Sequence, residues 1–340
     1  MATYRAGIIG CGRPWKSEGS TGFGMSHYHA RGYKDSPYTE LVALADLVPE
    51  NAEAFRDLHG GDAIYTDYKA MLANEHLDMV SICTWPQLHA RMVIDAAEAG
   101  VKAVHCEKPM APTWAEAKRM HDVCDERGVQ LTFNHQRRFG PEFVRARELV
   151  RDGAIGDLVR LEGACGNLFD WGTHWFDMFF FYNDERSVKW VLGQVEPTGG
   201  SSVFGVQLEG QGISQFEFDN GVIGILSTAN RKDWPLMTRI VGTDGVIEAA
   251  LRTDPLRAWL KGRTGWEVIE IERKSDLDHT VAIGVMDAIE ALHQGREPEL
   301  SSHKVIKATE LIFATYESAR RGRRIDLPLD VDDSAIYATV

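Results

Sequence analysis

Lys108, Asp170 and His174 are the side chains of this chain whose types and spacing best suit proton transfer. Lys108 follows a short apolar run in a Glu-Lys-Pro turn, and three residues separate Asp170 from His174. Histidine titrates near neutral pH and can take a hydroxyl proton, while a nearby carboxylate orients it and stabilises its charged form. A lysine can stabilise a developing alkoxide. Oxidation of an alcohol is therefore the chemistry that these groups could support.

The same residues also have an ordinary structural explanation. An isolated Asp-x-x-x-His more often lies on a surface or caps a helix, and the sequence does not decide whether His174 or Lys108 would take the proton; we favour His174. No metal site is expected, because the set is of mixed type with no His-x-x-x-His pair. The five cysteines are scattered without a Cys-x-x-Cys pair, which predicts reduced thiols.

A dinucleotide-binding turn is predicted near the N-terminus. An apolar strand over residues 4–9 leads into Gly10-Cys11-Gly12. Only glycine lets the backbone approach a pyrophosphate closely, so a strand running into Gly-x-Gly indicates the start of such a turn. By itself this short signal is weak, since many such strings are simple turns.

The turn departs from the usual pattern, because no third glycine follows Gly12 at the expected spacing. Residues 13–24 form an insertion, and we expect a helix to start near Met25 or Ser26, with Ser26 as its N-cap. The insertion either folds over a cofactor, with Lys16 and Ser20 near phosphate, or is a surface excursion. We lean toward the first alternative.

Asp46 ends the next predicted strand, residues 39–45. Without the insertion, its separation from Gly12 is roughly the 20 residues expected between the glycines and a ribose-binding acid. An acid at this position accepts hydrogen bonds from the ribose 2′-hydroxyl and repels a 2′-phosphate, which favours NAD over NADP. The alternative is that Asp46 caps the helix expected over residues 49–58.

Strands and helices then alternate with short connections, with further strands expected over residues 79–83, 101–106 and 129–133. This pattern predicts a parallel, doubly wound sheet, an α/β Rossmann domain over residues 1–136. Ligands bind beyond the carboxyl ends of such strands. Gly10, Asp46, Thr84 and Lys108 all follow strand ends, so we expect them to line one crevice.

The pattern changes after residue 136. Several short stretches alternate polar and apolar residues, and Asp219-Asn220-Gly221 indicates a tight hairpin between two of them. Helices are expected over residues 281–292 and 302–321. Residues 137–340 are therefore predicted to form an α+β domain with a large, mostly antiparallel open sheet, serving substrate binding and oligomerisation.

Composition narrows the class of ligand. The chain has 340 residues, a net charge of −13 and 44% hydrophobic residues, as soluble globular proteins do. The negative charge argues against a nucleic-acid partner or an anionic membrane surface. No signal peptide or spanning segment is apparent, so we expect a cytoplasmic protein with a small-molecule ligand.

Aromatic and polar residues gather around the Asp-x-x-x-His stretch. The aromatic residues Trp85, Phe169, Trp171, Trp175 and Trp234 could form walls for the apolar C–H faces of a sugar ring. The alternative is core packing, which is expected for some of Phe176 and Phe179 to Phe181. Arg137 and Asn167, with Arg138, Arg231, Lys232 and Asp233 as further candidates, could add polar contacts to a substrate.

These motifs together resemble the glucose–fructose oxidoreductase/inositol dehydrogenase (Gfo/Idh/MocA) family. The resemblance covers nearly the whole chain, and the insertion after Gly12 is its main departure from the family pattern. It is carried by Gly7-Ile8-Ile9-Gly10-Cys11-Gly12, His29-Ala30, Thr84-x-Pro86-x-x-His89, Glu107-Lys108-Pro109, Asp170-x-x-x-His174, Gly242-Thr243-Asp244-Gly245 and residues 295–328.

The resemblance implies a nicotinamide cofactor in the N-terminal domain and sugars, polyols or related cyclic alcohols as substrates. Lys108 would lie between nicotinamide and substrate, with Asp170 and His174 completing the acid–base group. Pairing of the open sheets of two subunits would give a homodimer or homotetramer. The residues implied at the cofactor are Gly10, Cys11, Gly12, Asp46, Thr84, Trp85, Pro86, His89, Glu107 and Lys108. Those implied at the substrate are Lys108, Arg137, Asn167, Asp170, Trp171 and His174.

Three functions remain open from the sequence. The leading hypothesis is an NAD(P)-dependent oxidoreductase, NAD preferred, that transfers hydride between the cofactor and a secondary hydroxyl of a sugar, sugar derivative or cyclitol. A second is glycoside hydrolysis or elimination through transient oxidation by a retained NAD. The third is a non-catalytic regulator that senses a dinucleotide, which the intact Lys108, Asp170 and His174 argue against.

Overall fold

The computed structural model describes residues 3–20, 22–200, 202–229, 237–250, 255–271, 276–331 and 336. The chain forms two compact units. The first unit comprises Met1–Ala111, Glu116–Gln136 and Asp276–Val305, and the second comprises Pro112–Ala115, Arg137–Ser275 and Ile306–Val340.

The first unit is built on a six-stranded sheet in the order β3-β2-β1-β4-β5-β6, and every neighbouring pair of strands is parallel. This is the strand order of a Rossmann fold, as the alternation of strands and helices predicted. The short strand β3 was not expected. The strands are β1 (Tyr4–Ile9), β2 (Thr39–Ala45), β3 (Ala63–Tyr65), β4 (Met79–Ile82), β5 (Ala103–Cys106) and β6 (Gln130–Phe133).

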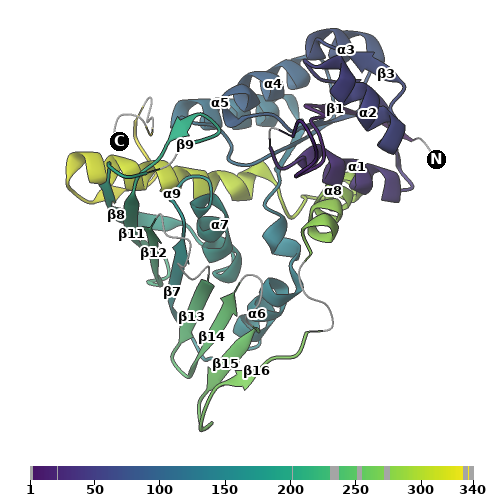
Figure 1. Ribbon diagram of the computed structural model, residues 1–340. Coiled ribbons are helices and arrows are strands. Elements are labelled where there is room, and N and C mark those ends of the chain that lie inside the picture. The colour runs from purple at the N-terminus through teal and green to yellow at the C-terminus, as the bar shows by residue number, and fades with distance from the viewer. Residues whose placement is uncertain are drawn as a thin grey trace. The chain divides into compact units, whose positions relative to one another are not determined.

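Helices surround this sheet (Figure 1). They are α1 (Met25–Asp35), α2 (Pro49–His59), α3 (Tyr68–Glu75), α4 (Pro86–Glu98), α5 (Trp114–Arg127) and, from much later in the chain, α8 (Leu277–Gln294). The sequence placed everything after residue 136 in the second domain, whereas α8 lies beside α1 in the first unit. The reason is packing, since Val285 and Ile289 of α8 join Tyr33 of α1 in one hydrophobic core.

The second unit contains a nine-stranded sheet in the order β16-β15-β14-β13-β7-β12-β11-β8-β17. β7 and β12 are parallel, and the other neighbouring pairs are antiparallel. The predicted hairpin joins β11 to β12, with Gly221 at φ 85°. The strands are β7 (Leu158–Cys165), β8 (Val188–Glu196), β11 (Gln211–Phe218), β12 (Ile223–Ala229), β13 (Met237–Gly242), β14 (Gly245–Ala250), β15 (Arg257–Leu260), β16 (Glu267–Val268) and β17 (Ile325–Asp326), and a separate ribbon pairs β9 (Ser202–Val203) with β10 (Val206–Gln207).

Helix α7 (Gly172–Tyr182) packs directly on this sheet, and all 11 of its residues are buried. A side chain at Gly163 of β7 would come within 2.7 Å of Trp175 and 2.8 Å of Phe179, so glycine permits this close approach. The remaining helical elements are η1 (Gln136–Phe139), α6 (Pro141–Arg151) and α9 (Ser302–Arg321). The packing of α7 fixes the segment that contains His174.

A buried carboxyl group supports the turn that precedes α7. Glu209 is 1% exposed, and its Oε1 accepts a hydrogen bond of 2.6 Å from the backbone N–H of Leu168. Its Oε2 accepts one of 2.5 Å from the Tyr316 hydroxyl. Burial raises the pKa of Glu209, although these hydrogen bonds act in the opposite direction. The carboxyl group thus ties the turn to α9.

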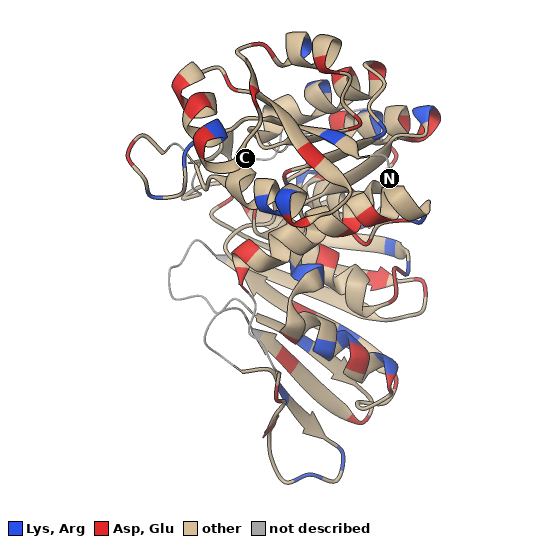
Figure 2. Ribbon diagram, turned by 90° about the vertical axis from the view of Figure 1, so that its right-hand side faces the viewer, with Lys and Arg blue, Asp and Glu red and all other residues tan. Residues whose placement is uncertain are grey.

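Charges of both signs are interspersed on the outer helices and strand ends (Figure 2). Surface ion pairs such as Arg151–Asp184 and Lys118–Asp122 join neighbouring residues of opposite sign. No helix among the described residues is both long enough and apolar enough to cross a membrane.

The contact between α1 and α8 predicts the effect of Gly32→Ala. A Cβ at Gly32 would lie 2.6 Å from Val285 Cβ and 2.8 Å from the Ala282 carbonyl oxygen. We expect the substitution to lower the free energy of unfolding by about 1–3 kcal/mol, because the two helices would have to separate. Urea unfolding followed by circular dichroism measures this change.

Gly22→Ala is the matched control, because apart from its chain neighbours no atom of the described residues lies within 4 Å of a Cβ at Gly22. Its free energy of unfolding should stay within about 0.5 kcal/mol of the parent protein. If Gly32→Ala were instead more stable, as the helix propensity of alanine alone implies, the close packing of α1 and α8 would be wrong.

The raised pKa of Glu209 predicts a pH-dependent effect of Glu209→Gln. When the pKa of a carboxyl group is higher in the folded than in the unfolded state, the group stabilises the folded state at pH values below its unfolded pKa. This contribution is lost as the pH rises through the folded pKa. Glutamine stays neutral, so the stability of the variant relative to the parent should increase from pH 4.5 toward neutrality. Thermal unfolding at a series of pH values tests this, and a pH-independent difference would contradict it.

Candidate active site

The carboxyl ends of β1 and β4 meet at Gly10. Its N–H donates to the Ala45 carbonyl (2.8 Å), and a Cβ at this position would lie 2.7 Å from the Cys83 carbonyl oxygen. Gly12, by contrast, has φ 57°, and apart from its chain neighbours no atom of the described residues lies within 4 Å of where a Cβ would be. The first glycine therefore permits close packing of two strand ends, and the second leaves open space beside the backbone.

Asp46 follows β2 at the same edge of the sheet. Its Oδ2 accepts a hydrogen bond from the Gly12 N–H and its Oδ1 accepts one from the Val48 N–H, both of 2.9 Å. A carboxylate has about four lone-pair positions, so acceptor capacity remains for hydroxyl groups of a ribose. Helix α2 starts at Pro49 with Val48 as its N-cap, so Asp46 lies outside the cap position that was the alternative explanation.

The insertion after Gly12 makes contacts mostly within itself. The Lys16 ammonium lies 4.1 Å from the ring centroid of Trp15, and the Ser20 hydroxyl donates to the Gly22 carbonyl (2.9 Å). These contacts engage the two side chains that were expected near phosphate. Arg13 also contacts a residue outside the insertion, with its Nε donating to Asn51 Oδ1 of α2 (3.0 Å).

Helix α1 begins at Met25, as expected, but its N-cap is Gly24 rather than Ser26. Gly24 has the left-handed conformation, φ 62° and ψ 38°. The hydroxyl of Ser26 donates instead to the backbone carbonyl of Cys11. Ser26 thus ties the first turn of the helix to the Gly10-Cys11-Gly12 turn.

Glu107, immediately before Lys108, is a buried carboxylate with its partners inside the first unit. His29 Nε2 lies 2.9 Å and Asn134 Nδ2 lies 2.6 Å from the same Oε1 atom. The other ring nitrogen of His29 contacts the Ser81 hydroxyl at 3.0 Å. Burial by itself would raise the pKa of Glu107, but these hydrogen bonds and the charge of His29 lower it below its usual value. The turn that presents Lys108 is therefore anchored to α1, β4 and the end of β6.

His89 of α4 braces the same turn from the other side. Its Nδ1 lies 2.9 Å from the Pro109 carbonyl, and its Nε2 lies 3.1 Å from the Thr84 carbonyl. The ring is fully buried and faces protein carbonyl groups at both nitrogens. Pro86 is the first residue of α4, and Trp85 is 51% exposed beside it.

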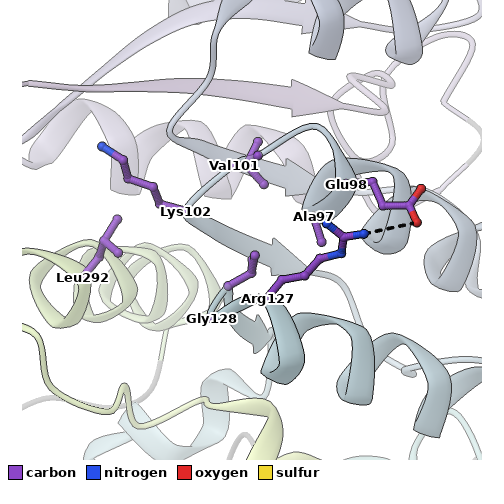
Figure 3. A pocket seen from close by; sticks show the side chains of 9 residues that line it. Ala97, Glu98, Val101, Lys102, Arg127, Gly128 and Leu292 are labelled. Carbon is purple, nitrogen blue, oxygen red and sulfur yellow. Dashed lines mark ion pairs between the residues drawn. The ribbon is translucent and has the colours of Figure 1, made fainter.

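A surface hollow of about 500 Å³ occurs at the opposite edge of the same sheet (Figure 3). Val101, Lys102 and Gly128 line it at the amino ends of β5 and β6, and Leu292 of α8 closes one side. Glu98 and Arg127 form an ion pair of 3.7 Å across it. Because ligands of such sheets bind at the carboxyl ends of the strands, this hollow is not the candidate site.

In the second unit, Asn167 organises the start of α7. Its side-chain oxygen accepts hydrogen bonds from the backbone N–H groups of Asp170 (2.7 Å) and Trp171 (3.0 Å). Helix α7 begins at Gly172, so that His174 lies in its first turn and Asp170 just before it. Asp170 and His174 are 8% and 5% exposed. Asn167 thus acts on the backbone that presents them, which leaves its predicted substrate contact as a hypothesis.

Arg137 and two tryptophans lie in the same part of the second unit. The Arg137 guanidinium carbon is 4.0 Å from the ring centroid of Trp175 and 5.7 Å from that of Trp171. Trp175 is buried, and its indole N–H donates to the Met237 carbonyl (3.0 Å). The further candidates Arg231, Lys232, Asp233 and Trp234 lie outside the described residues.

The sequence reasoning did not identify the partners of Glu107 or the role of Glu209. Ser81 and His105 did carry a usable signal, since a polar residue inside a short, fully buried strand must find a hydrogen-bond partner. Ser81 bonds to His29 and Tyr33, and His105 bonds to Thr132 (2.8 Å). Glu209 had no such local signal. Within the described part of the chain, no group of three or more His, Cys, Asp or Glu residues could hold a metal ion.

Residues 4–135 match a protein-family model, GFO_IDH_MocA, described as an oxidoreductase family with an NAD-binding Rossmann fold. A D-apiose dehydrogenase from Paraburkholderia graminis is 27% identical over 99% of this chain and 93% of its own length. An inositol 2-dehydrogenase from Rhizobium meliloti is 32% identical over 55% of this chain and 57% of its own length.

The fold is also similar to a solved structure of levoglucosan dehydrogenase in complex with NADH and levoglucosan. The TM-score is 0.82 at 21% sequence identity, covering 96% of this chain and all of the other. The likeness extends through both units and so includes the large mixed sheet. Residues 4–135 therefore resemble the NAD-binding Rossmann domain of the Gfo/Idh/MocA family of oxidoreductases, and the chain as a whole is similar to dehydrogenases over nearly its full length.

Proposed function

We propose that this oxidoreductase is an NAD-dependent dehydrogenase that acts on a secondary hydroxyl of a sugar, a sugar derivative or a cyclitol. Relatives named as D-apiose dehydrogenase and inositol 2-dehydrogenase support the substrate class. The observation that carries the proposal is the position of Lys108. It stands in the turn after β5, at the carboxyl edge of the Rossmann sheet, and Glu107 anchors that turn through His29 and Asn134.

The carboxyl edge of the sheet fits a dinucleotide. Open space beside Gly12 admits a pyrophosphate close to the backbone, and Asp46 has acceptor capacity left for the ribose hydroxyls. Gly10, Cys11, Thr84, Trp85 and Pro86 belong to the turns that surround this space. When bound, NAD supplies the acceptor for the hydride. The negative charge of Asp46, which repels a 2′-phosphate, is the reason for preferring NAD over NADP.

The chain's own residues then have distinct roles in the proposal. His174 takes the proton of the substrate hydroxyl, and Asp170 orients the imidazole and stabilises its charged form. Lys108 stabilises the negative charge that develops on the substrate oxygen. Asn167 keeps Asp170 at its position through the backbone. Assembly into a homodimer or homotetramer through the large sheet stays a prediction.

The deciding experiment is a substrate screen with the purified protein. Sugars, glycosides and inositols are offered with NAD and with NADP, and the absorbance of the reduced cofactor is followed. Reduction of NAD by one class of polyol supports the proposal. Release of product from a glycoside without net reduction, seen by mass spectrometry, would replace it with transient oxidation. NAD binding without either reaction would favour the sensing function.

Lys108→Ala should reduce kcat by about a hundredfold to ten-thousandfold, because the charge on the reacting oxygen loses its stabilising partner. The dissociation constant for NAD, measured by calorimetry, should change little. Lys102→Ala is the control, since Lys102 stands at the other end of the same strand, exposed and paired with Asp78 (2.8 Å). Weakened NAD binding with unaltered kcat would move Lys108 to a cofactor role.

Asp46→Asn should reduce the preference for NAD over NADP by about tenfold or more, measured as the ratio of the two kcat/KM values. The substitution preserves shape but removes the negative charge that repels a 2′-phosphate. Asp57→Asn, an exposed carboxylate on α2 paired only with neighbouring Arg56 among the contacts described, is the matched control. An unchanged ratio in Asp46→Asn would show that Asp46 does not contact the ribose.

A further inference from the structure

Two adjacent arginines in the second unit have opposite electrostatic surroundings. Arg138 is 1% exposed and forms a two-pronged ion pair with Asp177, from Nε to Oδ2 (2.9 Å) and from Nη2 to Oδ1 (2.8 Å). Its Nη1 donates to Glu185 Oε1 (2.6 Å). Its charge is therefore balanced within the fold, by the strongest geometry available to an arginine.

Arg137 has no such balance. Within the described part of the chain, no carboxylate lies within ion-pair distance of its guanidinium, and no hydrogen bond from its guanidinium is formed. Two indole rings hold the group instead, at 4.0 Å for Trp175 and 5.7 Å for Trp171. Contact with an aromatic ring stabilises a cation through the π face and uses none of its N–H groups.

Among the described residues, the Arg137 guanidinium is therefore held by aromatic contacts alone, and its N–H groups form no hydrogen bond. Loss of water lowers its pKa to about 9, with the nearby charge of Asp170 acting in the opposite direction, so the group is still a cation at neutral pH. An unbalanced charge in a largely water-depleted region is costly. A ligand that supplied a planar anion would both balance the charge and use the two parallel N–H groups of the guanidinium.

The neighbours of Arg137 indicate which anion fits. It lies in η1 and contacts Trp171 and Trp175, which belong to the segment that presents Asp170 and His174, and the carboxylate of Asp170 already contributes one negative charge nearby. A dianionic phosphate would meet a single unbalanced cation together with that carboxylate, and so would be repelled. A carboxylate carries one charge and matches the planar guanidinium in shape.

We propose that Arg137 is the recognition group for a carboxylate on the substrate, so that sugar acids or polyol acids are preferred to neutral sugars. This inference rests on the proposed dehydrogenase function. Arg137 is a specificity-determining residue in this account, and takes no part in proton or hydride transfer.

The test compares substrates that differ only in the charged group. Glucose, glucuronate and glucose 6-phosphate form one set, and galactose, galacturonate and galactose 6-phosphate a second. NAD reduction is followed for each with the full-length protein. We expect kcat/KM for the uronates to exceed that for the neutral sugars by about tenfold to a hundredfold, because one charge-assisted interaction is worth that much. The sugar phosphates should show no such advantage.

The variants Arg137→Met and Arg137→Lys test whether Arg137 causes the preference for uronates. Methionine removes the charge, and should reduce the ratio of uronate to neutral kcat/KM by about tenfold to a hundredfold, mainly through KM for the acid. Lysine keeps the charge without the planar pair of donors and should give an intermediate ratio. Arg145→Met is the matched control, because Arg145 is exposed on α6 and paired with Glu148 (2.9 Å), and should leave the ratio unchanged.

The outcomes separate the two proposals. Turnover of neutral sugars with no preference for uronates, or an unchanged ratio in Arg137→Met, overturns the carboxylate site and leaves the dehydrogenase proposal standing. A preference for sugar phosphates also overturns it. If no substrate is turned over, the proposed activity fails, and calorimetric titration with glucuronate and galacturonate tests the carboxylate site separately. Uronate binding that is lost in Arg137→Met supports the site. No uronate binding, or binding that Arg137→Met leaves unchanged, overturns it.

Discussion

The buried carboxylate of Glu107 is the constraint on which the candidate site most depends. A charge taken out of water is stable only with close partners. Its Oε1 finds two, His29 from α1 and Asn134 after β6, at 2.9 and 2.6 Å. Because these partners come from separate parts of the first unit, the arrangement forms only when helix and sheet are assembled. Lys108 is the next residue in the chain, so the position of its backbone is set by the assembled fold rather than by the turn alone.

The second unit fixes its candidate residues through buried acceptors in a similar way. The Asn167 side chain accepts hydrogen bonds from the backbone N–H groups of Asp170 and Trp171. The Glu209 side chain accepts one from the backbone N–H of Leu168. Each acceptor satisfies donors that would otherwise be left unpaired at the start of a buried helix. The backbone of Asp170 therefore occupies a defined position. In both units, buried polar side chains therefore fix the backbone that carries the candidate residues.

Arg137 and Arg138 show how a fold can treat identical neighbours differently. Arg138 is neutralised by Asp177 and Glu185, and this buried group stabilises the junction between η1 and α7. Arg137 is held only by aromatic rings among the contacts described, which position the charge without consuming its donors. The difference arises from which elements lie opposite each side chain. A charge that a fold positions but does not balance is available to a ligand.

The sequence by itself determined the features that depend on local chemistry. Gly10-Cys11-Gly12 after an apolar strand, Asp46 after the next strand and the hairpin at Gly221 follow from periodicity and turn residues. The alternation of strands and helices in the first half indicated the Rossmann sheet. Only the tertiary structure decided that α8 returns to the first unit, that Ser26 bonds to Cys11 instead of capping α1, and that Arg138, unlike Arg137, has carboxylate partners among the described residues. These outcomes depend on contacts between residues far apart in the chain, and such contacts leave no local pattern from which they could be predicted.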